Sequence, residues 1–139
     1  MTTSTSITVA ATVAASPEKV WEYYNGPTHI TAWNSASEDW HTPSSNNDLR
    51  VGGRFTHRME ARDGSQGFDF SGTYDEVKDL ERIAYTMDDG RKAIVDFKDL
   101  GDKTEVTVVF DAENEYPVDF QREGWQSILN EFKKYTEAK

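Results

Sequence analysis

The sequence predicts a single α+β domain spanning residues 1–139, in which a curved antiparallel β-sheet wraps around a long C-terminal α-helix. Two patterns predict this class. Apolar and polar residues alternate through most of the stretch from Arg54 to Phe110, as in half-buried strands, and the spacing becomes helical after Pro117. The length is also that of one ordinary domain, so no second core is required.

The N-terminal part is expected to form one strand and two short helices. The strand runs near Ser6 to Ala14, where every second residue is apolar. Ser16-Pro17 then starts a helix, because Ser is a preferred N-cap and Pro suits the first helical position. Asn25-Gly26-Pro27 stops it, and a second short helix covers Thr28 to Trp33.

The middle of the chain is expected to form a meander of five strands. Before it, Asn34 to Asp48 is polar and rich in Ser and Asn, and we expect it to be the least regular part. Asp63-Gly64, Asp89-Gly90 and Gly101-Asp102 are turn sequences between the alternating runs. The residues expected to face inward in these runs are Phe55, His57, Met59, Ala61, Phe68, Phe70, Gly72, Tyr74, Ile83, Tyr85, Met87, Ala93, Val95, Phe97, Val106, Val108 and Phe110.

The last segment, Pro117 to Lys139, is expected to form the long helix. One of its faces is apolar at helical spacing, which indicates packing on the sheet. Gly124 lies within the helix, where it costs about 1 kcal/mol relative to Ala, so we expect it to permit a close approach to the sheet or to a ligand. The residues of the apolar face are Trp125, Ile128, Leu129, Phe132 and Tyr135.

Composition excludes several classes of function. The 25 acidic and 15 basic residues give a formal charge of −10, which repels nucleic acid and anionic membrane surfaces. Cysteine is absent, and the three histidines have no metal-ligand spacing, so we expect no metal and no cofactor. No apolar stretch approaches the roughly 20 residues of a membrane-spanning helix. We expect a cytoplasmic protein that is a monomer or a weak homodimer.

Six short motifs and the single residue Trp33, in order along the chain, resemble those of the small bacterial members of the START-like (SRPBCC) superfamily. The sequence is most similar to the branch named after the activator of the heat-shock-protein-90 ATPase. This resemblance covers nearly the whole chain and implies the helix-grip (START-like, Bet v-like) fold. The segments that carry it are residues 16–21, Trp33, residues 49–55, 72–74, 83–86 and 104–108, and Gly124-Trp125.

The resemblance also implies a range of functions. Relatives bind lipids, polyketides, hormones or other apolar molecules beneath the long helix, some cyclise or hydrolyse them, and the eponymous eukaryotic proteins are co-chaperones. Those co-chaperones carry a separate N-terminal domain that engages the chaperone. Nothing precedes the START-like unit in this sequence, so a chaperone role is the least favoured expectation.

A helix laid in a curved sheet seldom fills the space between them, so we expect a mainly apolar cavity. His57 and Tyr85 are its expected polar groups, and each is weighed against an ordinary role in the core. Gly52-Gly53 is read as a turn or bulge and not as a phosphate-binding loop. The candidate ligand-binding residues are Trp33, Trp40, Phe55, His57, Met59, Phe68, Phe70, Tyr85, Met87, Phe97, Trp125 and Leu129.

The leading hypothesis is therefore binding of a small hydrophobic molecule between the helix and the sheet. One alternative is an enzyme of the cyclase, aromatase or hydrolase type that uses His57 and Tyr85 as acid, base or orienting group. A second alternative is a chaperone-interaction module. Binding is favoured over catalysis, because no residue at fixed spacing orients His57.

Overall fold

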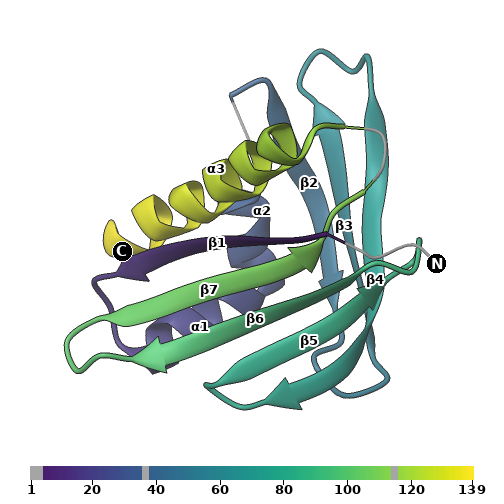
Figure 1. Cartoon of the computed structure of the whole chain (residues 1–139). Helices are drawn as coiled ribbons and strands as arrows, with labels where there is room; N and C mark the ends of the chain where they lie inside the picture. Colours follow the sequence, from purple (N-terminus) through teal and green to yellow (C-terminus); the bar gives the residue numbers. More distant parts are fainter. Residues whose placement is uncertain (1–4, 36–37, 114–115) are drawn as a thin grey trace.

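The computed structural model describes residues 5–35, 38–113 and 116–139. Its strands form one antiparallel seven-stranded sheet in the order β1-β7-β6-β5-β4-β3-β2, which curls around a C-terminal helix (Figure 1). This is the predicted helix-grip arrangement. The elements in chain order are β1 (Ser6–Val13), α1 (Pro17–Asn25), α2 (Pro27–Trp33), β2 (Trp40–Asn47), β3 (Arg54–Ala61), β4 (Gly67–Lys78), β5 (Arg82–Met87), β6 (Lys92–Asp99), β7 (Thr104–Asp111) and α3 (Val118–Glu137).

The expectation of an irregular segment between Asn34 and Asp48 is wrong. Most of that segment is the edge strand β2, which pairs with β3, so six strands follow the short helices instead of five. Its sequence shows no alternation because both of its faces are partly exposed. The register also shifts between His41 and Ser44, where Pro43 interrupts the ladder.

The inner face of the sheet carries the core in the predicted rows. Phe55, His57, Met59 and Ala61 of β3 are buried, and the residues between them are more exposed. A further irregularity in β4, between Tyr74 and Glu76, interrupts its pairing with β5. Bulges of this kind bend a strand and increase its twist, which helps the sheet to curl.

Gly72 of β4 permits a close contact inside this core. It lies opposite Phe55, and a Cβ atom at Gly72 would lie 2.8 Å from the Phe55 ring. The ring can therefore lie over β4 and meet Tyr85 of β5 edge-on, with centroids 4.9 Å apart. A side chain at position 72 would displace this ring.

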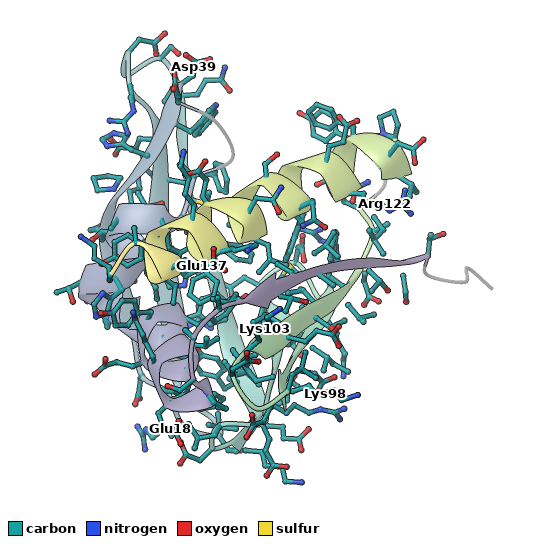
Figure 2. The ribbon with its side chains drawn as sticks, turned by 90° about the vertical axis from the view of Figure 1, so that its left-hand side faces the viewer. Glu18, Asp39, Lys98, Lys103, Arg122 and Glu137 are labelled. Atoms are coloured by element: carbon teal, nitrogen blue, oxygen red, sulfur yellow. The ribbon has the colours of Figure 1, made fainter. Side chains whose placement is uncertain are left out.

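Helix α3 lies along β1, the edge strand at the other end of the sheet (Figures 1 and 2). The Gln126 side chain donates to the carbonyl of Ala10 at 3.0 Å and accepts from its N–H at 3.4 Å. Glu137 accepts from the N–H of Ala14 at 2.8 Å. Side chains of the helix thus occupy backbone groups along the edge of β1. No helix in the described part of the chain has the length and apolar character to span a membrane.

Candidate functional site

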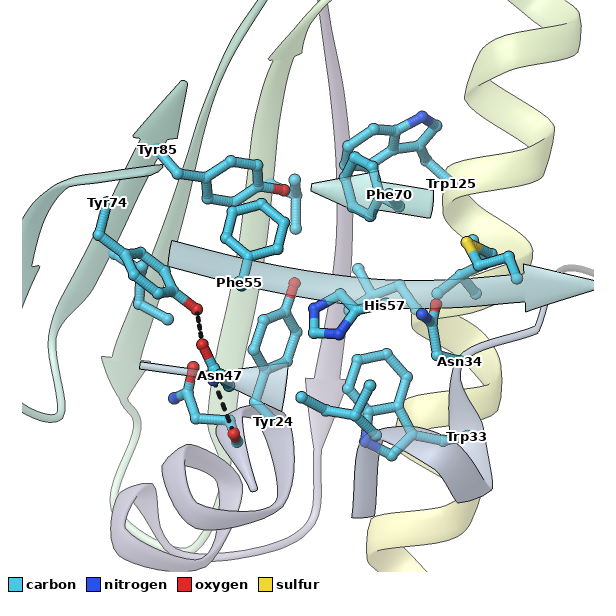
Figure 3. Close-up of a pocket in the computed structure, with 17 residues that line it drawn as sticks. Tyr24, Trp33, Asn34, Asn47, Phe55, His57, Phe70, Tyr74, Tyr85 and Trp125 are labelled. Carbon is cyan, nitrogen blue, oxygen red and sulfur yellow. Dashed lines mark hydrogen bonds between the residues drawn. The ribbon is translucent and has the colours of Figure 1, made fainter. Parts of the chain in front are cut away.

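A cavity of about 100 Å³ lies where α3, α1 and α2 face strands β3, β4, β5 and β7 (Figure 3). The four residues expected to converge there, His57, Met59, Phe70 and Tyr85, all line it. Four further candidates line it as well, namely Trp33, Phe55, Trp125 and Leu129. Alternation along the strands and helical spacing in α3 therefore located this space, and the ligand role of its residues stays a prediction.

Four other candidates lie outside this inner cavity. Trp40 and Phe68 line a separate groove, described below. Met87 and Phe97 are buried in the core. Neither is among the described residues that line the inner cavity or the groove. Phe97 faces inward as expected, but α1 fills the space in front of it. Its ring meets Trp21 at 5.1 Å and Tyr24 at 5.4 Å, both edge-on.

A polar network that sequence reasoning missed forms one side of the cavity. The Tyr74 hydroxyl donates to the Asn47 side-chain oxygen, and the Asn47 amide donates to the carbonyl of Asn25 at 2.8 Å (Figure 3). The Asn25 amide donates in turn to the carbonyl of Trp21 at 2.9 Å. The network joins β4, β2 and α1, so it could not be predicted without β2.

His57 is held in place by the same missed strand. Its Nδ1 lies 2.8 Å from Oγ of Ser45, directly across the β2–β3 ladder. Its ring also stacks on Phe55, with centroids 5.3 Å apart. Burial lowers the pKa of His57 to about 4, so the imidazole is neutral at pH 7.

Two tyrosines reach the cavity from opposite sides, Tyr24 from α1 and Tyr85 from β5 (Figure 3). Burial raises the pKa of both phenols above the ordinary value of 10.0, and the neighbouring Tyr74 adds to this effect. Both hydroxyls are therefore protonated at any physiological pH. Tyr24 falls within the first predicted helix, but nothing in the sequence indicated that its hydroxyl faces a cavity.

Asn34 completes the missed polar lining. It is buried, and Thr42 of β2 donates to its backbone carbonyl. Asn34 lines the cavity, as His57 does (Figure 3). Ile83, Val108 and Ile128, which were expected only in the core, also line the cavity, as does Ile30, for which no role was expected.

A groove of about 320 Å³ lies beside the inner cavity, between the N-terminal half of α3 and strands β2 to β4. Met59, Phe70, Trp125 and Ile128 line both spaces, so the two spaces meet at these residues. The groove is rich in aromatic residues, and Phe68 and Phe120 are 48% and 60% exposed. Its other lining residues are Trp40, Arg91, Glu113, Tyr116, Gln121 and Gly124.

Gly124 does not serve the close helix–sheet approach that its position suggested. A Cβ atom added there would have no neighbour within 4 Å, because the residue faces the groove. That part of the expectation is wrong. The glycine leaves the groove wider than any other residue would.

The described residues contain no group of three or more His, Asp or Glu side chains arranged to hold a metal ion. Gly52 adopts φ +83°, and Gly52 and Gly53 exchange backbone hydrogen bonds with Tyr74 in a turn before β3. This is the turn that the sequence predicts.

Comparison with known proteins supports the family and the fold. The family model described as "Activator of Hsp90 ATPase homolog 1-like protein" matches residues 14–137. The solution structure of an AHSA1-like protein from Aeromonas hydrophila is 46% identical, with a TM-score of 0.90 over 96% of this chain and 93% of that one. Chr148 from Cytophaga hutchinsonii is 52% identical, with a TM-score of 0.83 over 95% and 92% of the two chains.

A crystal structure of the protein CV1439 from Chromobacterium violaceum shares the fold at 24% identity, with a TM-score of 0.83 over 95% of this chain and 96% of that one. No curated protein matches the sequence. The family model and the two close structures agree with the helix-grip architecture and with the START-like superfamily expected from the motifs. The chain therefore belongs to the family of Activator of Hsp90 ATPase homolog 1-like proteins.

Proposed function

We propose that this protein binds a small hydrophobic molecule in the space formed by the inner cavity and the adjoining groove. The observation that carries the proposal is their common wall of Met59, Phe70, Trp125 and Ile128. The inner cavity, at about 100 Å³, is smaller than the roughly 150 Å³ cavity known to hold benzene. The groove, at about 320 Å³, falls within the roughly 300–1,000 Å³ range of ligand sites. A ligand would therefore lie in the groove and extend one end into the cavity.

Acid–base chemistry by His57 and Tyr85 is the weaker proposal. A general base works best when its pKa is near the working pH. The pKa of His57 is lowered to about 4, and burial raises the pKa of Tyr85 well above its ordinary value. Both shifts move the pKa away from pH 7. They favour a role for His57 and Tyr85 in holding a ligand over a role in transferring its protons.

Further features of the proposal follow from composition and resemblance. Lipids and polyketides are the ligand types that the superfamily suggests. The acidic net charge disfavours nucleic acid as a partner. We propose that the protein is a single domain, that it is located in the cytoplasm, and that it is a monomer or a weak homodimer.

A neutral apolar fluorophore, N-phenyl-1-naphthylamine, tests the proposal. We expect it to bind the wild-type protein with an affinity on the order of micromolar. Met59→Trp places a larger side chain where the two spaces meet and should abolish binding. The matched control is Val51→Trp, because Val51 is 64% exposed and lines neither space.

Urea denaturation of both variants shows whether the fold is retained. If Met59→Trp unfolds the protein, Gly124→Leu narrows the groove from the helix side and takes its place. Unchanged fluorophore binding in a folded blocking variant would place the site elsewhere. Binding lost equally in Val51→Trp would point to an exposed surface, as the chaperone-interaction alternative requires.

A further inference from the structure

No charged side chain is found among the described residues that line the inner cavity, and this favours an uncharged group at the buried end of the ligand. We infer that the ligand carries an uncharged hydrogen-bonding group, such as a phenol, alcohol or carbonyl, which it inserts between Tyr24, Tyr85 and His57. Carboxylate, phosphate and ammonium groups are excluded from this end. The inference rests on the proposed function and names the class of ligand for the same site.

The first argument is electrostatic. Among the described residues that line the inner cavity there is no Asp, Glu, Lys or Arg, and the one histidine is neutral at pH 7. Moving an ionised group from water into such a site without a partner costs far more than moving a neutral hydroxyl. The tyrosine hydroxyls can hydrogen-bond an ionised end, but no opposite charge in this lining offsets the rest of its lost hydration.

The second argument concerns hydrogen bonds that the protein leaves free. Of the three tyrosines at the cavity, Tyr74 is already bonded to Asn47. The hydroxyls of Tyr24 and Tyr85 form no hydrogen bond with another described residue. His57 uses Nδ1 toward Ser45, which leaves Nε2 available.

A hydroxyl or carbonyl of a ligand would satisfy these groups. Each neutral hydrogen bond between such a group and the ligand adds a modest amount to the affinity. Figure 3 shows Tyr24, Tyr85 and His57 reaching the same space from three different elements. The two tyrosine hydroxyls can donate to an oxygen of the ligand, and Nε2 of His57 donates or accepts according to its tautomer.

The groove differs, because its lining includes Arg91 and Glu113. One carboxylate oxygen of Glu113 is buried and has no hydrogen-bond partner in the described part of the chain. A charged group on the ligand is therefore compatible with the outer end only. This sets the orientation of the ligand, with its neutral end inside and its apolar body between Phe68 and Phe120.

Three probes of one shape test the inference by calorimetric titration at pH 7, namely biphenyl, 4-phenylphenol and biphenyl-4-carboxylate. We expect 4-phenylphenol to bind about threefold to tenfold more tightly than biphenyl, which is the gain from one neutral hydrogen bond. The double variant Tyr24→Phe/Tyr85→Phe should bring the ratio of the two affinities close to one, whatever the affinity for biphenyl itself. Urea denaturation shows whether the variant is folded.

The carboxylate is compared with the phenol in an Arg91→Gln protein, so that no cation of the groove can hold the anion. We expect the carboxylate to bind at least about tenfold more weakly than 4-phenylphenol there. Equal binding of biphenyl and 4-phenylphenol, or a carboxylate that matches the phenol in Arg91→Gln, would overturn the inference and leave the proposed function intact. Failure of all three probes to bind would overturn the proposed function and the inference with it.

Discussion

The two halves of helix α3 are built differently. In the C-terminal half, Leu129, Phe132 and Thr136 are buried, and the Phe132 ring meets Tyr24 and Trp33 edge-on at 5.1 and 5.0 Å. In the N-terminal half, Phe120 is exposed and Gly124 faces open space beside the groove. The C-terminal half of the helix thus packs into the core, whereas the N-terminal half leaves a groove open.

This difference separates stability from binding within one element. The C-terminal half attaches the helix to the core, so substitutions there should act mainly on the free energy of unfolding. The N-terminal half covers the groove, so substitutions there should act mainly on the space available to a ligand. Trp125 stands between the two halves, stacked on Phe110 of β7 with centroids 3.9 Å apart.

The largest expected difference is between two phenylalanines of the same helix. Phe132→Ala removes a fully buried ring and should lower the free energy of unfolding by about 3–5 kcal/mol. Phe120→Ala, at an exposed ring, should change it by no more than roughly 0.5 kcal/mol. Urea denaturation of the two variants measures both values, and similar losses would show that the halves are packed alike.

The pH dependence of the free energy of unfolding measures how well the inner cavity keeps water away from His57. His57 has its pKa lowered from 6.5 to about 4 by burial, so the unfolded state binds more protons between these values. Stability should therefore be complete above about pH 6.5 and fall as the pH drops toward 4. The contribution of this one group is about 3 kcal/mol.

The control for this measurement is His57→Gln, which should lose that part of the pH dependence and keep the rest. Nuclear magnetic resonance of the imidazole gives the pKa directly. A pKa near 6.5 in the folded protein would mean that water reaches His57 freely. The inner cavity would then be no better enclosed than the groove.

The smallest expected effect has the opposite sign. Gly124→Ala places a methyl group where no atom lies within 4 Å and improves helix propensity, so it should raise the free energy of unfolding by up to about 1 kcal/mol. The groove should remain able to bind a probe, since a methyl group is small. Destabilisation in thermal or urea unfolding would show that the helix lies closer to the sheet at this point than described.

Sequence alone predicted the parts of the fold whose side chains are buried on one face. Strands β3, β5, β6 and β7 alternate because their inner faces lie in the core, and α3 has a helical apolar stripe for the same reason. The strand β2 has no such signal, because it is an edge strand with Pro43 near a register shift. It could be found only once a partner strand was known.

The candidate site was predicted in the same uneven way. The apolar wall follows from alternation, but Ser45 and Asn47 belong to the missed strand, so the polar wall was missed with it. The prediction that a side chain faces inward also did not show whether that side chain packs in the core or lines a cavity. Phe97 and Phe70 both face inward, and only the packing of α1 decides that the first is enclosed in the core while the second lines a cavity.

The hydrogen bonds from α3 to β1 have a consequence for self-association. An uncovered sheet edge is a template on which another chain can add a strand, and fibrils grow in this way. Gln126 and Glu137 occupy backbone groups of Ala10 and Ala14, so the same helix that covers the ligand space also protects this edge. A motion large enough to detach the helix would expose the edge of β1 and so favour aggregation. Entry of the ligand through the groove, with the helix in place, avoids this exposure.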